Sequence, residues 1–112
     1  MRLFYLLAGW LLALPVLAAS NVNAHVLYVR VDVDGRGVVT FDSTIVGTPP
    51  ACVISYYNNA FAFDSNTAGG KAILATVLSA KASGSLVSVY GTGACAIYGV
   101  SVEDWGSGSM YN

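Results

Sequence analysis

The uncharged apolar stretch near the start of the chain constrains the fold most strongly, because it separates a part that is removed from a part that folds. Arg2 supplies a short positive segment, and Leu3 to Ala19 contains no charge and is broken by Pro15. This pattern, followed by small residues, is typical of a cleavable export signal. A membrane anchor is the alternative, but the apolar run is shorter than the ~20 residues that a spanning helix needs.

Two places in this segment fit signal cleavage. Val22-Asn23-Ala24 matches the small-x-Ala pattern, and Ala18-Ala19-Ser20 is a second candidate just before it. The first choice assigns residues 1–24 to a signal peptide and residues 25–112 to a single domain. We therefore expect a secreted or periplasmic protein with no membrane span after cleavage.

The charge of the remaining domain excludes one class of partner. Without Arg2, the chain has four basic and six acidic side chains, a net charge of −2. A mildly acidic domain with few basic groups binds the phosphate backbone of nucleic acids poorly. We expect no nucleic-acid partner.

Two cysteines, Cys52 and Cys95, are present in the chain. In an oxidising compartment they form one disulfide, and its connectivity is unambiguous. Closing a loop of this length stabilises the fold by about 4 kcal/mol in the chain-entropy model, which a domain of this size needs because it buries a modest share of its surface. Two free thiols, one of them reactive, are the alternative.

Alternation of apolar and polar residues predicts a half-buried strand over residues 26–33, with Leu27, Val29, Val31 and Val33 on one face. Asp34 to Gly37 predicts a hairpin turn, and the return strand begins at Val38. We expect further strands at residues 52–57, 86–90 and 96–102. The Gly- and Ser-rich tail from about residue 106 is expected to be frayed.

One helix is predicted from Ala68 to Ala82. Asp64, Ser65 or Asn66 can cap its start, and Gly84 suits its end. The resulting order β-β-β-α-β-β is that of a small OB-fold-like five-stranded barrel, a mainly β domain with one helix. An open antiparallel sheet with the helix packed on one face is the alternative.

The two faces of this helix differ in an unusual way. An apolar stripe is expected to face the core: Ile73, Leu74, Val77, Leu78 and Ala80. The opposite face is small and uncharged, where a solvent-facing helix normally carries Glu and Lys: Ala72, Ala75, Thr76, Ser79 and Ser83. These five residues are candidates for a subunit contact in a homo-oligomer. A short exposed helix of low complexity is the alternative.

Motifs that resemble catalytic or metal sites are incomplete. His25 is the only histidine and is expected at the start of the mature chain, so there is no internal histidine for a triad and no second histidine for a metal site. Asp32-Val33-Asp34-Gly35 resembles the opening of a calcium loop but lacks the Glu at loop position twelve. Glu103 and Asp104 are adjacent, so in a strand they point to opposite faces and cannot flank one bond. We expect no enzyme activity, no metal and no cofactor.

Aromatic residues are the remaining candidates for binding, because tyrosine and tryptophan suit sugar stacking and protein interfaces. They are Tyr28, Tyr56, Tyr57, Tyr90, Tyr98, Trp105 and Tyr111. The alternative is that most of these rings fill the core. The sequence thus favours a non-enzymatic binding module that recognises a glycan or a protein; a structural or accessory envelope protein without a small ligand is the alternative.

Residues 51–90 contain a Cys-containing strand ending in Ser (Ala51 to Ser55), an alanine- and leucine-bearing helix, a Ser-Gly turn and a Val-x-Val-Tyr segment (Val87 to Tyr90). This stretch resembles the B subunits of subtilase-cytotoxin-type AB5 toxins. The resemblance implies a secreted OB-fold subunit of a pentameric ring that binds cell-surface glycans, with the helix towards the central pore. The C-terminal part does not match, and no sugar-binding residue is carried over.

Overall fold

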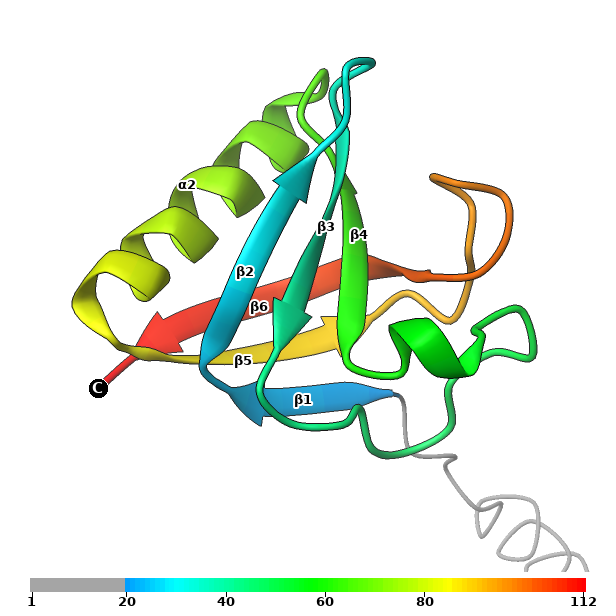
Figure 1. Cartoon of the computed structure of the whole chain (residues 1–112), viewed down its shortest axis with the longest axis horizontal. Helices are drawn as coiled ribbons and strands as arrows, with labels where there is room; N and C mark the ends of the chain where they lie inside the picture. The colour runs from blue at the N-terminus through cyan, green and yellow to red at the C-terminus, as the bar shows by residue number, and fades with distance from the viewer. Residues whose placement is uncertain (1–19) are drawn as a thin grey trace, which may run out of the picture.

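The computed structural model describes residues 20–112 (Figure 1); most of the expected signal peptide, residues 1–19, lies outside this range. Within these residues, six strands, one α-helix and one short 3-10 helix follow one another. They are β1 (Asn21–Ala24), β2 (Val26–Val31), β3 (Arg36–Phe41), η1 (Ser55–Tyr57), β4 (Ala60–Asp64), α2 (Ala68–Ser83), β5 (Leu86–Gly91) and β6 (Glu103–Tyr111). The expected mainly β domain with one helix is confirmed.

The strands form one mixed sheet in the order β1-β5-β6-β4-β3-β2. Neighbouring strands are antiparallel except β4 and β6, which are parallel. In Figure 1 the group β1, β5 and β6 crosses the group β2, β3 and β4 steeply, so the sheet is strongly coiled. The edge strands β1 and β2 are separated in sequence by His25 alone. The expected five-stranded barrel is wrong, because this sheet is not closed into a barrel and has six strands. The additional strand is β1, which lies in residues that the sequence assigned to the signal peptide.

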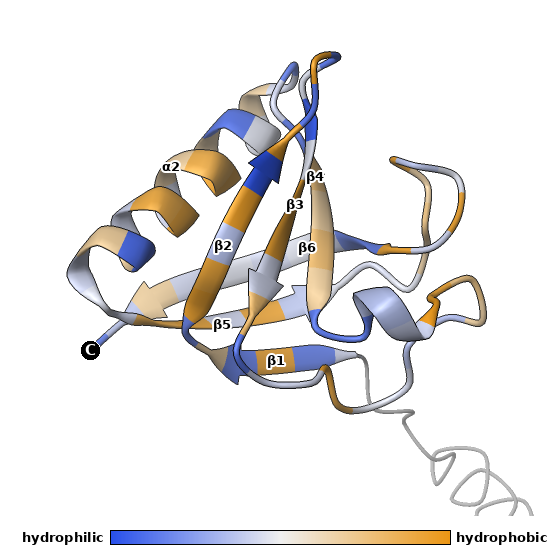
Figure 2. Ribbon diagram, viewed as in Figure 1, coloured by the Kyte–Doolittle hydropathy of each residue, from blue (hydrophilic) through white to orange (hydrophobic). Residues whose placement is uncertain are grey.

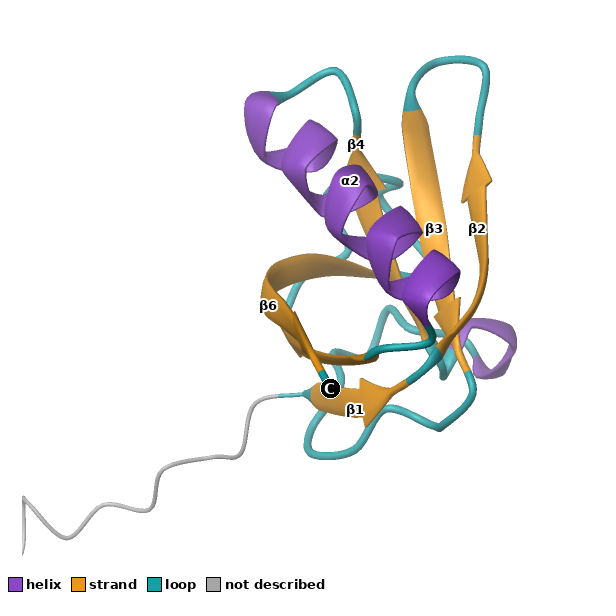
Figure 3. Cartoon of the chain, turned by 90° about the vertical axis from the view of Figure 1, so that its left-hand side faces the viewer, coloured by secondary structure: helices purple, strands orange, loops and turns teal. Residues whose placement is uncertain are grey.

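Strand β6 joins the two halves of the sheet and bends strongly as it does so (Figure 3). Glu103 and Asp104 pair with β4, and the rest of β6 pairs with β5. The expected strand at residues 96–102 and the frayed tail from residue 106 are therefore wrong. The glycines of this tail allow close packing instead of fraying: a Cβ at Gly108 would collide with the Trp105 ring.

The third strand lies later than the sequence suggested. Residues 52–57 form a turn and η1, and the strand is β4. Phe61 and Phe63 of β4 belong to the main core, whereas Ala60 and Ala62 belong to a second, smaller buried cluster. This Ala-Phe alternation has the period of two that marks a strand. All four residues from Ala60 to Phe63 are buried, whereas none of residues 52–57 is.

Helix α2 matches its prediction to within one residue. Thr67, rather than Asp64, Ser65 or Asn66, caps it by accepting a hydrogen bond of 2.9 Å from the Gly70 amide. Gly84 ends the helix in the left-handed conformation with φ 70°, as expected.

Helix α2 lies along the sheet, and apolar residues recur along its ribbon (Figure 2). Val77 and Ala80 are buried, and Ile73 and Leu74 pack against the main core. Leu78, expected in the stripe, is half exposed.

The first two strands bury different amounts of surface. Val22 and Ala24 of β1 lie in the main core, so the folded unit extends ahead of His25, where the sequence placed the start of the domain. In β2, by contrast, Leu27 and Val31 are about half exposed. β2 is an edge strand, and an irregularity between Val26 and Tyr28 shifts its pairing with β3.

Candidate functional site

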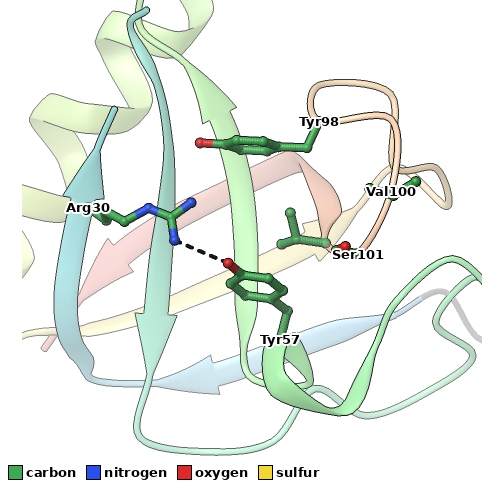
Figure 4. Close-up of a pocket in the computed structure, with 6 residues that line it drawn as sticks. Arg30, Tyr57, Tyr98, Val100 and Ser101 are labelled. Atoms are coloured by element: carbon green, nitrogen blue, oxygen red, sulfur yellow. Dashed lines mark hydrogen bonds between the residues drawn. The ribbon is translucent and has the colours of Figure 1, made fainter. Parts of the chain in front are cut away.

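A small hollow of about 130 Å³ opens between β2, η1 and the loop that precedes β6 (Figure 4). Its lining residues are Arg30, Tyr57, Tyr98, Val100, Ser101 and Val102. Figure 4 shows the Arg30 guanidinium between the two tyrosine side chains, with Val100 and Ser101 beside them. Three segments that are distant in the sequence therefore build this pocket.

The confirmed Cys52–Cys95 disulfide ties two of these segments together, with 6.3 Å between the two Cα atoms. Backbone hydrogen bonds continue the link. The Ile54 amide donates to the Ser101 carbonyl at 3.0 Å, and the Ser101 amide donates to the Cys52 carbonyl at 2.9 Å. The walls that carry Tyr57 and Tyr98 are thus held at a fixed spacing.

Arg30 connects the two rings. Its Nη1 donates a hydrogen bond of 3.1 Å to the Tyr57 hydroxyl, which raises the pKa of the guanidinium. Its Cζ lies 6.0 Å from the centroid of the Tyr57 ring and 5.9 Å from that of the Tyr98 ring. These distances are at the outer limit of cation–π attraction. Arg30 is therefore joined to Tyr57 by a hydrogen bond, whereas its hydrogen-bonded connection to Tyr98 runs through Asp32.

Asp32 completes the polar network. The Tyr98 hydroxyl donates to Asp32 Oδ2 at 2.5 Å, and Arg30 Nε donates to Asp32 Oδ1 at 3.0 Å. The hydrogen bond from Tyr98, followed by that from Arg30, lowers the pKa of Asp32. Burial raises the pKa of Tyr98, and the bond to Asp32 raises it further. A neutral phenol and an ionised carboxylate are the paired states at neutral pH.

A second guanidinium, that of Arg36, contacts Tyr98. Arg36 belongs to the β2–β3 hairpin, whose turn was predicted at Asp34 to Gly37. Arg36 Cζ lies 4.5 Å from the Tyr98 ring centroid, and its Nη1 donates to the Ile97 carbonyl at 3.1 Å. Arg36 also pairs with Asp34 at 2.7 Å, which lowers the pKa of that carboxyl. Two arginines and two aspartates therefore balance one another around the pocket.

Ser101 forms part of the pocket wall in an unusual backbone conformation. Its φ of 77° is the one positive value found at a non-glycine residue among residues 20–112. Such conformations are costly and persist where the surroundings enforce them, often at functional sites. Here the two backbone hydrogen bonds to the Cys52–Ile54 segment enforce it.

The structure sorts the aromatic candidates. Tyr57 and Tyr98 come together in the pocket, Tyr56 lies beside Tyr57 with its ring 4.9 Å away, and Trp105 is buried in the core. Arg30 was not expected to take part. The alternating pattern of the β2 segment does place Arg30 on the polar face. The pattern does not show which residues lie opposite Arg30, because these come from two loops that are distant in the sequence.

The remaining candidates lie elsewhere. The five small helix residues are on the outer side of α2, all exposed except the partly buried Thr76. Thr76 and Ser83 donate their hydroxyls to the Ala72 and Ser79 carbonyls of the same helix, both at 2.9 Å. His25 is exposed, and its ring Nδ1 lies 3.3 Å from Asp42.

Glu103 and Asp104 are both buried and have different neighbours. The Glu103 carboxylate accepts hydrogen bonds from the Ser20 hydroxyl and the Gly93 amide. The Asp104 carboxylate accepts hydrogen bonds from the amides of Ala96 and Ile97. Within residues 20–112 no group of three potential ligand side chains is placed to hold a metal ion. No helix in this part of the chain is both long and apolar enough to cross a membrane. Comparisons with protein-family models, curated proteins and solved structures found no match.

Proposed function

We propose that the protein is an exported, non-enzymatic binding module that recognises one ring of a glycan in the pocket of Arg30, Tyr57 and Tyr98. The observation that carries this proposal is the pair of tyrosines held at fixed spacing by a guanidinium and a disulfide. Aromatic faces stack on the CH faces of sugars, while hydroxyl and guanidinium groups bond sugar oxygens.

The size of the pocket sets the size of the ligand. At about 130 Å³ it is smaller than the ~300–1,000 Å³ clefts that enclose drug-sized ligands. One sugar ring at the end of a chain fits such a site, and so does a single protein side chain. Because the charges of Arg30 and Arg36 are offset by Asp32 and Asp34, we favour a neutral ring over a highly charged group.

The topology supports an OB-like arrangement. If β1 and β2 are taken as one strand bent at His25, the sheet order returns to its own first strand: it runs from β2 through β3, β4, β6 and β5 to β1. A parallel contact between β4 and β6 and a helix between β4 and β5 complete the pattern. This arrangement and residues 51–90 together favour kinship with toxin B-subunit-like glycan binders.

Binding of the purified, exported protein to an array of immobilised glycans tests the proposal. We expect Tyr98→Ala to weaken binding to the recognised glycan by about tenfold or more, as at other buried aromatic anchors. Tyr90→Ala is the matched control, because Tyr90 is a half-exposed tyrosine of β5 outside the pocket. Binding to no glycan, or unchanged binding by a folded Tyr98→Ala variant, would contradict the proposal.

A structural or accessory envelope protein is the second candidate. The observation that favours it is the apolar edge strand β2, on which Leu27, Tyr28 and Val31 are about half exposed. An exposed apolar edge is suited to contact with another protein. A protein that forms stable complexes through β2 and binds no glycan would support this candidate.

A further inference from the structure

Glu103 is a fully buried carboxylate whose hydrogen bonding is half complete. Its Oε2 accepts the Ser20 hydroxyl at 2.5 Å and the Gly93 amide at 2.8 Å. Its Oε1 is also buried and has no hydrogen-bond partner within residues 20–112. A buried carboxylate oxygen without a donor is rare and destabilising. The site therefore lacks one donor, preferably a cationic one.

Ser20 is placed to supply that donor. It is buried, its hydroxyl contacts Glu103, and its carbonyl accepts the Gly91 amide at 3.0 Å. Three covalent bonds separate the hydroxyl oxygen of a serine from its own backbone nitrogen, so the contact of the Ser20 hydroxyl with Glu103 Oε2 keeps that nitrogen in the neighbourhood of the carboxylate. Gly91 makes room for this arrangement, because a Cβ there would collide with both the Glu103 carboxylate and the Ser20 hydroxyl.

Strand β1 shows where the folded unit begins. Its residues pair with β5 from Asn21 to Ala24, and Val22 and Ala24 are 2% exposed. Cleavage after Ala24 would remove this strand and leave the edge of β5 unpaired at Val87 and Val89, which are fully buried and lie opposite Ala24 and Val22. Cleavage ahead of Ser20 would keep both the strand and the buried Ser20. Ala19 would be the small residue directly before the cut, and Leu17 would stand at the third position before it.

We propose that the export leader is removed at the Ala19–Ser20 bond and that the new α-ammonium group of Ser20 forms an ion pair with Oε1 of Glu103. In this hydrolysis the C–N bond breaks and water adds its oxygen to the Ala19 carbonyl carbon. The released Ser20 amine takes up a proton at neutral pH. The proposal rests on the proposed export of the chain and is independent of the glycan ligand.

Processing would then complete the fold. Before cleavage, the Ser20 nitrogen is part of a neutral amide; after cleavage it is a cation beside a buried anion. The ion pair would hold the start of β1 against β5 and β6, next to the Gly91–Gly93 turn. The mature chain would be more stable than its precursor without any change of fold.

Intact-mass analysis of the full chain exported by a bacterial host tests the cleavage. We expect a product that spans residues 20–112. A product that starts at His25 would overturn the inference and leave the export proposal intact, whereas an uncleaved chain would overturn both. Loss of glycan binding with correct cleavage would overturn the proposed ligand alone.

Thermal unfolding of the exported protein tests the ion pair. One glycine inserted between Ala19 and Ser20, and shown by intact mass to remain at the start of the product, moves the amine away from Glu103, and we expect a melting temperature lower by about 5 °C. In Glu103→Gln, which keeps an acceptor for Ser20 and Gly93, the insertion should have no effect. Asp104→Asn is the matched control, because Asp104 already has its own amide partners, so the insertion should still lower the melting temperature there.

An equal fall in the Glu103→Gln background, or no fall in the wild type, would overturn the ion pair. Periodate provides a test that needs no variant, because it oxidises a serine only at the amino terminus. We expect the folded protein to react about tenfold or more slowly than the unfolded protein. Equal rates in the two states would overturn the buried amine.

Discussion

Tyr98 carries the pH dependence of the pocket at the scale of single residues. Burial and the hydrogen bond to Asp32 raise its pKa, and the same bond lowers the pKa of Asp32. A tyrosine with a raised pKa stabilises the fold in its neutral form. That contribution is complete below the ordinary value of about 10 and is lost as the pH rises through the raised value.

We predict that an ultraviolet titration shows a phenolate transition above the ordinary tyrosine range, and that Tyr98→Phe removes it. Asp32→Asn should move this transition to lower pH, because the neighbouring negative charge and the strong acceptor are gone. Loss of a transition within the ordinary range in Tyr98→Phe would show that the hydroxyl is neither buried nor paired as described.

Replacing either of two glycines with alanine adds one methyl group, and the two sites have opposite surroundings. Gly91→Ala should destabilise the protein by about 1–3 kcal/mol or more, because the added Cβ collides with the Glu103 carboxylate. Gly69→Ala adds the same group near the start of α2, where nothing lies within 4 Å, and should stabilise by about 0.5–1 kcal/mol. Urea unfolding of the two variants measures both signs, and equal effects would contradict the packing around Glu103.

At the scale of elements, the hairpin and α2 could be predicted from the sequence. The turn glycine, the residues that cap the helix and its apolar stripe each lie within the segment whose structure they determine. Strands β4 and β6 were misplaced, because their positions depend on distant partners. Residues 52–57 read as a strand in isolation, but Phe61 and Phe63 reach the core. The pocket was only partly predictable. Tyr57 and Tyr98 were candidates for binding, but their proximity in space depends on the disulfide and on the course of the loop before β6.

The Cys52–Cys95 disulfide links the loop before β4 to the loop before β6, across 43 residues of sequence. We predict that its reduction, or Cys52→Ser with Cys95→Ser, lowers the free energy of unfolding by about 4 kcal/mol. Glycan binding should weaken as well, because the spacing of Tyr57 and Tyr98 is then free to vary. Calorimetry and binding of the reduced protein measure both effects. An unchanged melting temperature would mean that packing alone holds these loops.

At the scale of the whole molecule, two surfaces are available for contacts and do not compete. Helix α2 lies along one side of the sheet, whereas η1 and the loop before β6 lie on the other side (Figure 1). The outer face of α2 is small and uncharged, and its Thr76 and Ser83 hydroxyls are bonded within the helix. Such a face allows close approach of a second copy, and assembly through it would leave the pocket open to ligand.

We predict that the protein is a homo-oligomer that contacts itself through Ala72, Ala75, Thr76, Ser79 and Ser83. In the isolated chain Ala75 and Ser79 are exposed, so Ala75→Arg or Ser79→Glu should leave the monomer folded, with a change within about 0.5 kcal/mol. In an assembly the new charge would be buried without a partner, which costs several kcal/mol, and the oligomer should dissociate. Light scattering of wild type and variants measures this. A wild-type monomer at high protein concentration would contradict the prediction and weaken the case for a toxin-like ring, because such a ring requires contacts between copies.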